Sequence, residues 1–145
     1  MPHQITRTMT GLSNFRLREF RGYAKIPLSA LNFDHALSGE RHRTLSQRNV
    51  NRLRQIFSLE GCHRYDENNF VSGIVDSNEL AEALHAIGFS PTATLEAPTD
   101  VESIPLLKVR NIKCLYGLHR VRAGQQYLDV ENQWWIVKLY TGKRR

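Results

Sequence analysis

The chain has 145 residues, of which 41% are hydrophobic, and its formal net charge is +6. This length and composition predict one compact globular domain with a core of ordinary size and leave little room for two. No apolar run approaches the roughly 20 residues that span a bilayer, and the first residues lack the apolar segment of a secretory signal, so we expect an intracellular protein without a membrane partner.

The expected domain occupies residues 23–141. Residues 1–22 show no periodicity and are expected to form an irregular, basic N-terminal arm. The closing TGKRR follows an apolar segment directly. Residues 142–145 are therefore expected to begin a linker or to mark a truncated C-terminus.

The first half of the domain predicts a strand, a loop and a helix. The sequence YAKIPLSAL at 23–31 is typical of a short strand, and the polar, glycine-containing residues 35–44 indicate a loop. Ser46 is a suitable N-cap for a helix. The apolar stripe of that basic helix comprises Val50, Leu53 and Phe57.

A second strand and helix follow. Residues 69–76 (NFVSGIVD) predict a strand, and Asp76 or Ser77 can cap the next helix, which Gly88 ends. The apolar stripe of this helix comprises Leu80, Ala83, Leu84 and Ile87. Proline and acidic residues between 90 and 103 indicate a loop.

The last third predicts a strand at 106–116, a helix at 119–128 and a strand at 133–141. The alternation of strands and helices predicts an α/β fold of the α+β type, with about three helices packed on a small mixed sheet.

The positive charge is concentrated near the N-terminus. Residues 1–54 hold ten Lys or Arg against three Asp or Glu, whereas residues 55–145 hold ten against eleven. Such a basic third could bind a polyanion such as DNA, or it could form a solvated basic surface. The candidate nucleic-acid-binding residues are Arg41, Arg43, Arg48, Arg52 and Arg54.

Two segments contain Gly-x-His-Arg, a combination that suits anion binding. Gly117 in CLYGLHRVRA follows an apolar strand and precedes a helix, whose first N–H groups would point at a bound phosphate. Gly61 in LEGCHRYDEN instead ends a helix, in a left-handed conformation, and acidic residues follow it. We therefore expect the anion site at Gly117.

The segment from Gly117 to Ala123 resembles the nucleotide-phosphate motif of the ParB/sulfiredoxin fold. Gly117, Arg120, Arg122 and Ala123 match the ParB pattern Gly-Glu-Arg-Arg-x-Arg-Ala, and Gly117, His119 and Arg120 match the sulfiredoxin pattern Gly-Gly-Cys-His-Arg. The resemblance covers roughly residues 23 to 141, with the helix at 77–88 as an insertion, and implies a ParB/sulfiredoxin-like mixed sheet.

That resemblance implies a nucleotide ligand, ATP or CTP, which could bind together with Mg²⁺. The implied nucleotide- and phosphate-binding residues are Gly117, Leu118, His119, Arg120, Arg122, Arg52 and Asn49. Leu118 stands where sulfiredoxins have the nucleophilic cysteine and ParB proteins a glutamate, so sulfiredoxin activity is not expected. No carboxylate lies inside the motif, and an NTPase or phosphotransferase reaction remains an open question.

The chain also resembles the N-terminal domain of a fungal family of unknown function that is carried on Starship mobile elements. The resemblance lies in SLEGCHRYDENNFVSGIVD together with CLYGLHRVRAGQQYLDVENQWWIVKLY. It implies that the chain is part of a longer protein and says nothing of a reaction.

Several candidate residues have a structural alternative. Arg120 could bridge two phosphate oxygens or pair with Asp129 or Glu131, and His119 could contact phosphate or act as a capping or packed histidine. Trp134 and Trp135 could stack on nucleic-acid bases, but we expect them to lie in the core and at its rim.

The two cysteines, Cys62 and Cys114, form no Cys-x-x-Cys pair, so neither a disulfide framework nor a metal site is expected. Cys62 is more typical of a small buried side chain than of a nucleophile.

Two functions remain. The first is a nucleotide-phosphate-binding domain, and the second is a DNA-binding module with a degenerate nucleotide pocket, which would act in the nucleus.

Overall fold

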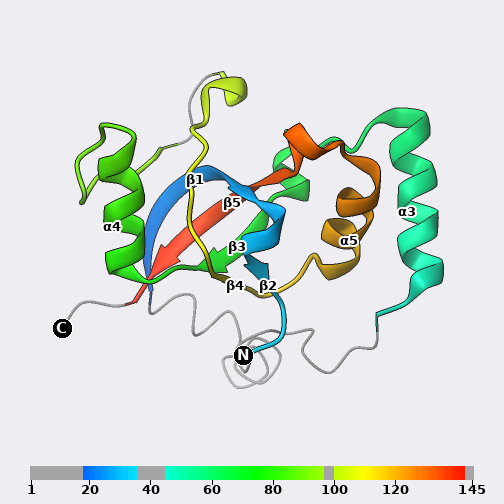
Figure 1. Ribbon diagram of the computed structural model, residues 1–145, viewed down its shortest axis with the longest axis horizontal. Coiled ribbons are helices and arrows are strands. Elements are labelled where there is room, and N and C mark those ends of the chain that lie inside the picture. The colour runs from blue at the N-terminus through cyan, green and yellow to red at the C-terminus, as the bar shows by residue number, and fades with distance from the viewer. Residues whose placement is uncertain (1–17, 36–44, 97–99, 143–145) are drawn as a thin grey trace, which may run out of the picture.

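The computed structural model describes residues 18–35, 45–96 and 100–142. Within these ranges the chain forms three α-helices and a mixed five-stranded sheet, which confirms the predicted α+β class (Figure 1). The strands are β1 (Glu19–Pro27), β2 (Leu31–Asn32), β3 (Val71–Ile74), β4 (Ile112–Cys114) and β5 (Trp134–Thr141). The helices are α3 (Gln47–Glu60), α4 (Ser77–Ala86) and α5 (Leu118–Tyr127).

The strands lie in the order β1-β5-β3-β4-β2. The pairs β1–β5 and β3–β4 are antiparallel, whereas β3–β5 and β2–β4 are parallel. Figure 1 shows the sheet across the middle of the molecule, with α4 at one end and α3 and α5 at the other. The sheet therefore connects two separate groups of helices.

One face of the sheet holds the hydrophobic core. The strand register places Ala24 and Val71 beside Val137, and Leu139 and Cys114 on either side of Gly73, so the side chains of these residues point to the same face. All three helices contribute buried side chains to the same cluster. These helix residues are Val50 and Phe57 of α3, Leu80, Ala83 and Leu84 of α4, and Val121 and Ala123 of α5.

The opposite face of the sheet carries aromatic and basic side chains. The ring centroids of Phe20 and Tyr23 are 5.5 Å apart, those of Phe20 and Tyr140 5.4 Å, and those of Tyr23 and Phe70 5.8 Å. Lys113 also points to this face, because its neighbours Ile112 and Cys114 point into the core.

The helix ends follow the predicted signals closely. The hydroxyl of Ser46 accepts the N–H of Asn49 at 3.2 Å, and α3 begins at the next residue. Gly61, which follows α3, has the positive φ that its position predicts, 86°. Its ψ of 164° is extended, so the predicted left-handed conformation is wrong.

At α4 the predicted cap is also present. One carboxylate oxygen of Asp76 accepts the N–H groups of Asn78 and Glu79. The helix ends at Ala86, and Gly88 follows with φ 87°. Ile87 is 38% exposed and lies outside the core, unlike the rest of its predicted stripe.

The first strand begins earlier than predicted. Residues 19–22 belong to β1 rather than to an irregular arm, and a bulge lies between Phe20 and Gly22. The side chain of Arg21 is buried and donates to the carbonyls of Pro91 and Ala93 at 3.3 and 2.8 Å. The bulge breaks the alternation of side chains, so this part of the strand lacks the alternating apolar and polar residues from which a strand is predicted.

The predicted strand at 106–116 is mostly irregular, since only Ile112–Cys114 joins the sheet as β4. Before it, the N–H of Leu107 donates to the carbonyl of Lys25 at 2.9 Å, and Lys25 donates to the carbonyl of Pro105 at 2.8 Å. Leu107 and Val109 are buried in the core. The apolar run therefore reflects burial along a crossing segment rather than a long strand.

The predictions for residues 1–17, for the loop at 36–44 with Arg41 and Arg43, and for residues 143–145 lie outside the described ranges.

Candidate phosphate-binding site

Gly117 forms the turn between β4 and α5. Its φ of 104° and ψ of 12° lie in the left-handed region, which glycine adopts without strain. A Cβ atom at this position would lie 3.2 Å from a methyl group of Val71, so the turn is also close to the sheet. The predicted order of strand, glycine turn and helix is therefore present.

The start of α5 is suited to a negative charge. Gly117 has no side chain to cap the helix, and the first turn holds no acidic residue. The backbone N–H groups of His119 and Arg120 have no acceptor within the described ranges. Unpaired N–H groups and the helix dipole both favour an anion at such a position.

The helix α3 begins beside α5. The backbone N–H of Ser46 donates to Nε2 of His119 at 3.0 Å, and further along the helices the guanidinium of Arg54 donates to the side chain of Gln126 at 3.3 Å. The two helices therefore run side by side in the same direction, as Figure 1 shows. The first turn of α3 also lacks an acidic residue.

His119 has a structural partner in this arrangement. Because Nε2 accepts the N–H of Ser46, the ring nitrogen left to donate is Nδ1. This contact joins the cap of α3 to the first turn of α5. It favours the predicted alternative of a packed histidine, while Nδ1 remains a donor.

Arg120 and Arg122 differ in their surroundings. Arg120 is half-buried and forms no ion pair within the described residues, so the structural alternative of a pair with Asp129 or Glu131 is not observed. Arg122 donates to the side chain of Gln125 at 3.1 Å, one turn further from the helix start. Arg120 is therefore the better candidate for an anion at Gly117.

The remaining predicted ligands contribute unequally. Leu118 packs against the core, and its side chain offers no polar contact. Asn49 is half-buried in the first turn of α3, and Arg52 is exposed one turn later. No hydrogen bond or ion pair joins either side chain to α5 within the described ranges, so these two residues stay predicted ligands.

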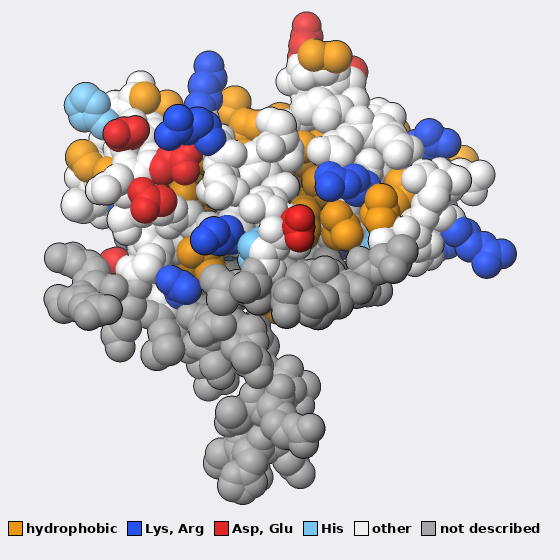
Figure 2. All heavy atoms as spheres, turned by 60° about the horizontal axis from the view of Figure 1, so that its bottom comes forward, with side chains coloured by type: hydrophobic (Ala, Val, Ile, Leu, Met, Phe, Trp, Pro, Cys, Tyr) orange, Lys and Arg blue, Asp and Glu red, His pale blue; other side chains and the backbone are white. Residues whose placement is uncertain are grey.

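The predicted nucleic-acid-binding arginines of α3 are all exposed. Arg48, Arg52 and Arg54 lie on a helix whose first acidic residue is Glu60, at its end. Figure 2 shows Lys and Arg side chains spread over both halves of this face, whereas most of the acidic side chains in the view gather at the end of the molecule where α4 lies.

The second Gly-x-His-Arg segment has a structural role that the sequence did not indicate. The guanidinium of Arg64 lies 3.4 Å from the ring centroid of Trp134 and donates to the carbonyls of Asn132 and Trp134 at 2.7 and 2.9 Å. Burial lowers the pKa of the Arg64 guanidinium. Cys62 is half-buried and packs against the core.

The tryptophan pair is divided between core and rim, as predicted. Trp135 is fully buried, and Trp134 is half-buried under Arg64. The ammonium of Lys25 also lies 4.8 Å from the centroid of the Trp134 ring. These cations occupy the surroundings of Trp134, which disfavours base stacking on this ring.

No helix in the described part of the chain is long and apolar enough to cross a membrane. Across the same ranges, no three His, Cys, Asp or Glu side chains form a group that could hold a metal ion.

Comparison with known proteins gives one match. Neither the curated proteins nor the solved structures include a match to the chain, and the resemblances to ParB, to sulfiredoxin and to proteins of mobile elements stay predictions. A family model does match residues 19–144, which run from the first residue of β1 to beyond β5. The chain therefore belongs to the family described as protein of unknown function (DUF3723) N-terminal domain.

Proposed function

We propose that the chain binds the phosphate groups of a nucleotide where α5 and α3 begin. The observation that carries this proposal is the start of α5 at Gly117, where no side chain caps the helix and the N–H groups of His119 and Arg120 have no acceptor among the described residues. The absence of an acidic residue from the first turns of α3 and α5 supports it further, since a carboxylate there would repel phosphate.

In this proposal the N–H groups of His119 and Arg120 donate to one phosphate oxygen, and the guanidinium of Arg120 donates to two others. Asn49 and Arg52 approach from α3, and Nδ1 of His119 supplies a further donor. ATP or CTP with Mg²⁺ is the proposed ligand, in line with the ParB/sulfiredoxin resemblance. The proposal covers binding alone, because the motif holds no carboxylate that could act as a general base.

Calorimetry with ATP, CTP and ADP, each with Mg²⁺, tests this proposal. We expect saturable heat for at least one nucleotide, and Arg120→Ala should weaken its affinity by about 10- to 100-fold, the usual loss for a hydrogen bond to a charged group. Arg54→Ala is the matched control, because Arg54 contacts Gln126 away from the helix start. Absence of heat for all three nucleotides would refute the proposal.

A second candidate function is DNA binding by α3. It is favoured by the exposure of Arg48, Arg52 and Arg54 on a helix that has no acidic residue before Glu60. In this candidate the chain is a module of a larger protein, in line with the family's description as an N-terminal domain and with the resemblance to proteins of fungal mobile elements.

Salt dependence tests the second candidate. The affinity for duplex DNA should fall steeply with salt. In the double variant Arg48→Ala/Arg52→Ala, the negative slope of log K against log salt should become shallower by about 2. Arg110→Ala is the control, since this exposed arginine lies in the segment before β4. Equal slopes for both variants would count against α3 as the DNA-binding element.

A further inference from the structure

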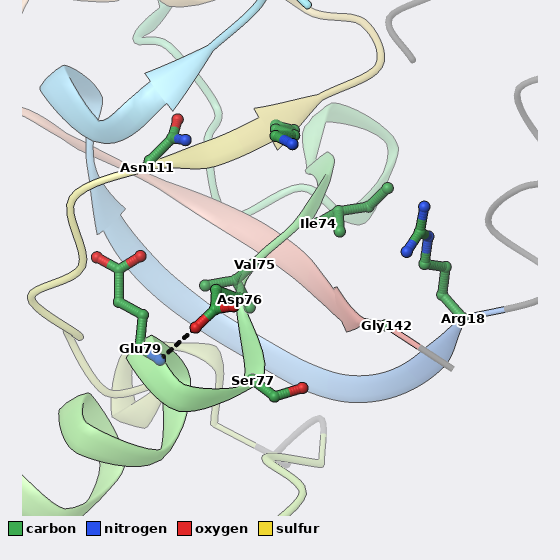
Figure 3. A pocket seen from close by; sticks show the side chains of 9 residues that line it. Arg18, Ile74, Val75, Asp76, Ser77, Glu79, Asn111 and Gly142 are labelled. Atoms are coloured by element: carbon green, nitrogen blue, oxygen red, sulfur yellow. Dashed lines mark hydrogen bonds between the residues drawn. The ribbon is translucent and has the colours of Figure 1, made fainter. Parts of the chain in front are cut away.

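A cavity of about 320 Å³ lies at the start of α4, against β4 and beside the neighbouring start of β1 and end of β5, where Arg18 and Gly142 lie. Figure 3 shows Arg18, Ile74, Asp76 and Ser77 around this space. The volume is at the lower end of the range for small-molecule sites. The cavity is thus large enough for one small polar group and the part of the ligand that bears it.

The two carboxylates of this cavity already have partners. One oxygen of Asp76 accepts the N–H groups of Asn78 and Glu79 at 3.0 and 3.1 Å, one of which Figure 3 marks. Glu79 accepts the backbone N–H of Arg110 and lies 3.6 Å from Nε of that arginine. The negative charge in the lining is therefore largely compensated by the protein itself.

The two cations of the cavity are not compensated in this way. Neither Arg18 nor Lys113 has an ion-pair partner in the described ranges of the chain. Nε of Arg18 is buried and has no hydrogen-bond acceptor. Because this nitrogen is closed to solvent, an anion in the cavity would contact the terminal nitrogens of the guanidinium, one of which lies beside Gly142 of the lining.

Ser77 and Asn111 add neutral polar groups to the same lining. A hydroxyl and an amide can each donate to an anionic oxygen. Besides Asp76, whose carboxylate is hydrogen-bonded to the first turn of α4, the lining thus offers two cations and two neutral donors. An anion with several oxygens matches this set better than a cation or an apolar ligand.

We propose that this cavity binds the phosphate group of a small molecule. Arg18 contacts two of its oxygens, and Lys113 adds a second positive charge. Two uncompensated cations match a phosphate dianion, whereas a carboxylate would neutralise only one of them. Asp76 opposes the bound anion and limits its affinity.

This site is separate from the one at Gly117. Lys113 points away from the hydrophobic core and lines the cavity at the start of α4, whereas Gly117 begins α5, which packs on the core. The proposal therefore stands or falls independently of nucleotide binding at α5.

Amide chemical shifts during titration with inorganic phosphate, at constant ionic strength, test the proposal. We expect saturable shifts at Ser77, Asn111 and Lys113. Arg18→Gln and Lys113→Gln should each weaken binding by about tenfold or more, because each removes a charged donor. Lys108→Gln is the matched control, since Lys108 is an exposed lysine of the same segment outside the cavity lining, and Arg120→Ala should also have no effect.

Asp76→Asn supplies a test of opposite sign. Asparagine keeps a side-chain oxygen for the cap of α4 but removes the negative charge, so phosphate affinity should rise by about threefold. Acetate should bind more weakly than phosphate at the same site. Absence of shifts at Ser77 and Lys113, shifts confined to residues 117–120, or equal affinities of the wild-type protein and Lys113→Gln would each overturn the proposal.

Discussion

The close approach of Gly22 to Leu95 makes Gly22→Ala the most informative change to the fold. Gly22 is buried in β1, with φ 103°, at the bulge. A Cβ atom there would overlap the backbone of Leu95, including its carbonyl group. That backbone is held in place by two hydrogen bonds, from Tyr23 N–H to its carbonyl and from its own N–H to the carbonyl of Arg21, at 2.7 and 2.9 Å.

Two contributions make up the expected cost of Gly22→Ala. The positive φ alone costs an alanine about 1 to 2 kcal/mol. Moving Leu95 away adds overpacking and weakens two hydrogen bonds, together about 2 to 3 kcal/mol. The free energy of unfolding should therefore fall by about 3 to 5 kcal/mol.

Gly88→Ala is the matched control for this prediction. Gly88 also has a positive φ, 87°, but a Cβ atom there would meet no atom within 4 Å. It should cost only about 1 to 2 kcal/mol. Urea unfolding of both variants measures the difference, and equal costs would show that the Leu95 segment does not lie against β1.

Three further changes test other contacts. Burial is the larger cause and nearby tyrosines the smaller cause of a pKa of Tyr140 raised above 10.0. The hydroxyl of Tyr140 therefore keeps its proton to a higher pH in the folded state than in the unfolded chain. The free energy of unfolding should then fall as the pH rises above about 10, and Tyr140→Phe should reduce that slope in urea titrations; an identical slope would contradict it. His119→Ala removes the acceptor of the backbone N–H of Ser46 and should lower the free energy of unfolding by about 1 kcal/mol. An unchanged midpoint of urea unfolding would rule out this contact. Arg64→Ala should cost about 2 to 3 kcal/mol through lost hydrogen bonds and stacking, and Arg64→Lys should restore little of it by thermal unfolding, since full rescue by lysine would exclude stacking on Trp134.

Local signals predicted most of the helices and strands. Ser46 and Asp76 begin helices because their side chains accept backbone N–H groups, and this chemistry can be read from adjacent residues. The turn at Gly117 was equally readable, because a glycine between an apolar strand and an amphipathic helix has few other roles. These features depend on neighbours in the chain.

Long-range contacts could not be predicted in the same way. The start of β1 depends on Arg21, whose partners Pro91 and Ala93 are 70 and 72 residues away. The cavity beside α4 likewise joins Arg18 to Lys113, which are remote in sequence. The stacking of Arg64 on Trp134 could not be predicted for the same reason, since the two residues are 70 positions apart.

The most direct test of the proposed function follows the amide signals of residues 118–121 during titration with ATP and CTP in the presence of Mg²⁺. Binding at the start of α5 predicts saturable shifts of the His119 and Arg120 signals that Arg120→Ala abolishes and Arg54→Ala preserves. Signals that do not move for either nucleotide, or shifts that persist unchanged in Arg120→Ala, would contradict nucleotide-phosphate binding at Gly117.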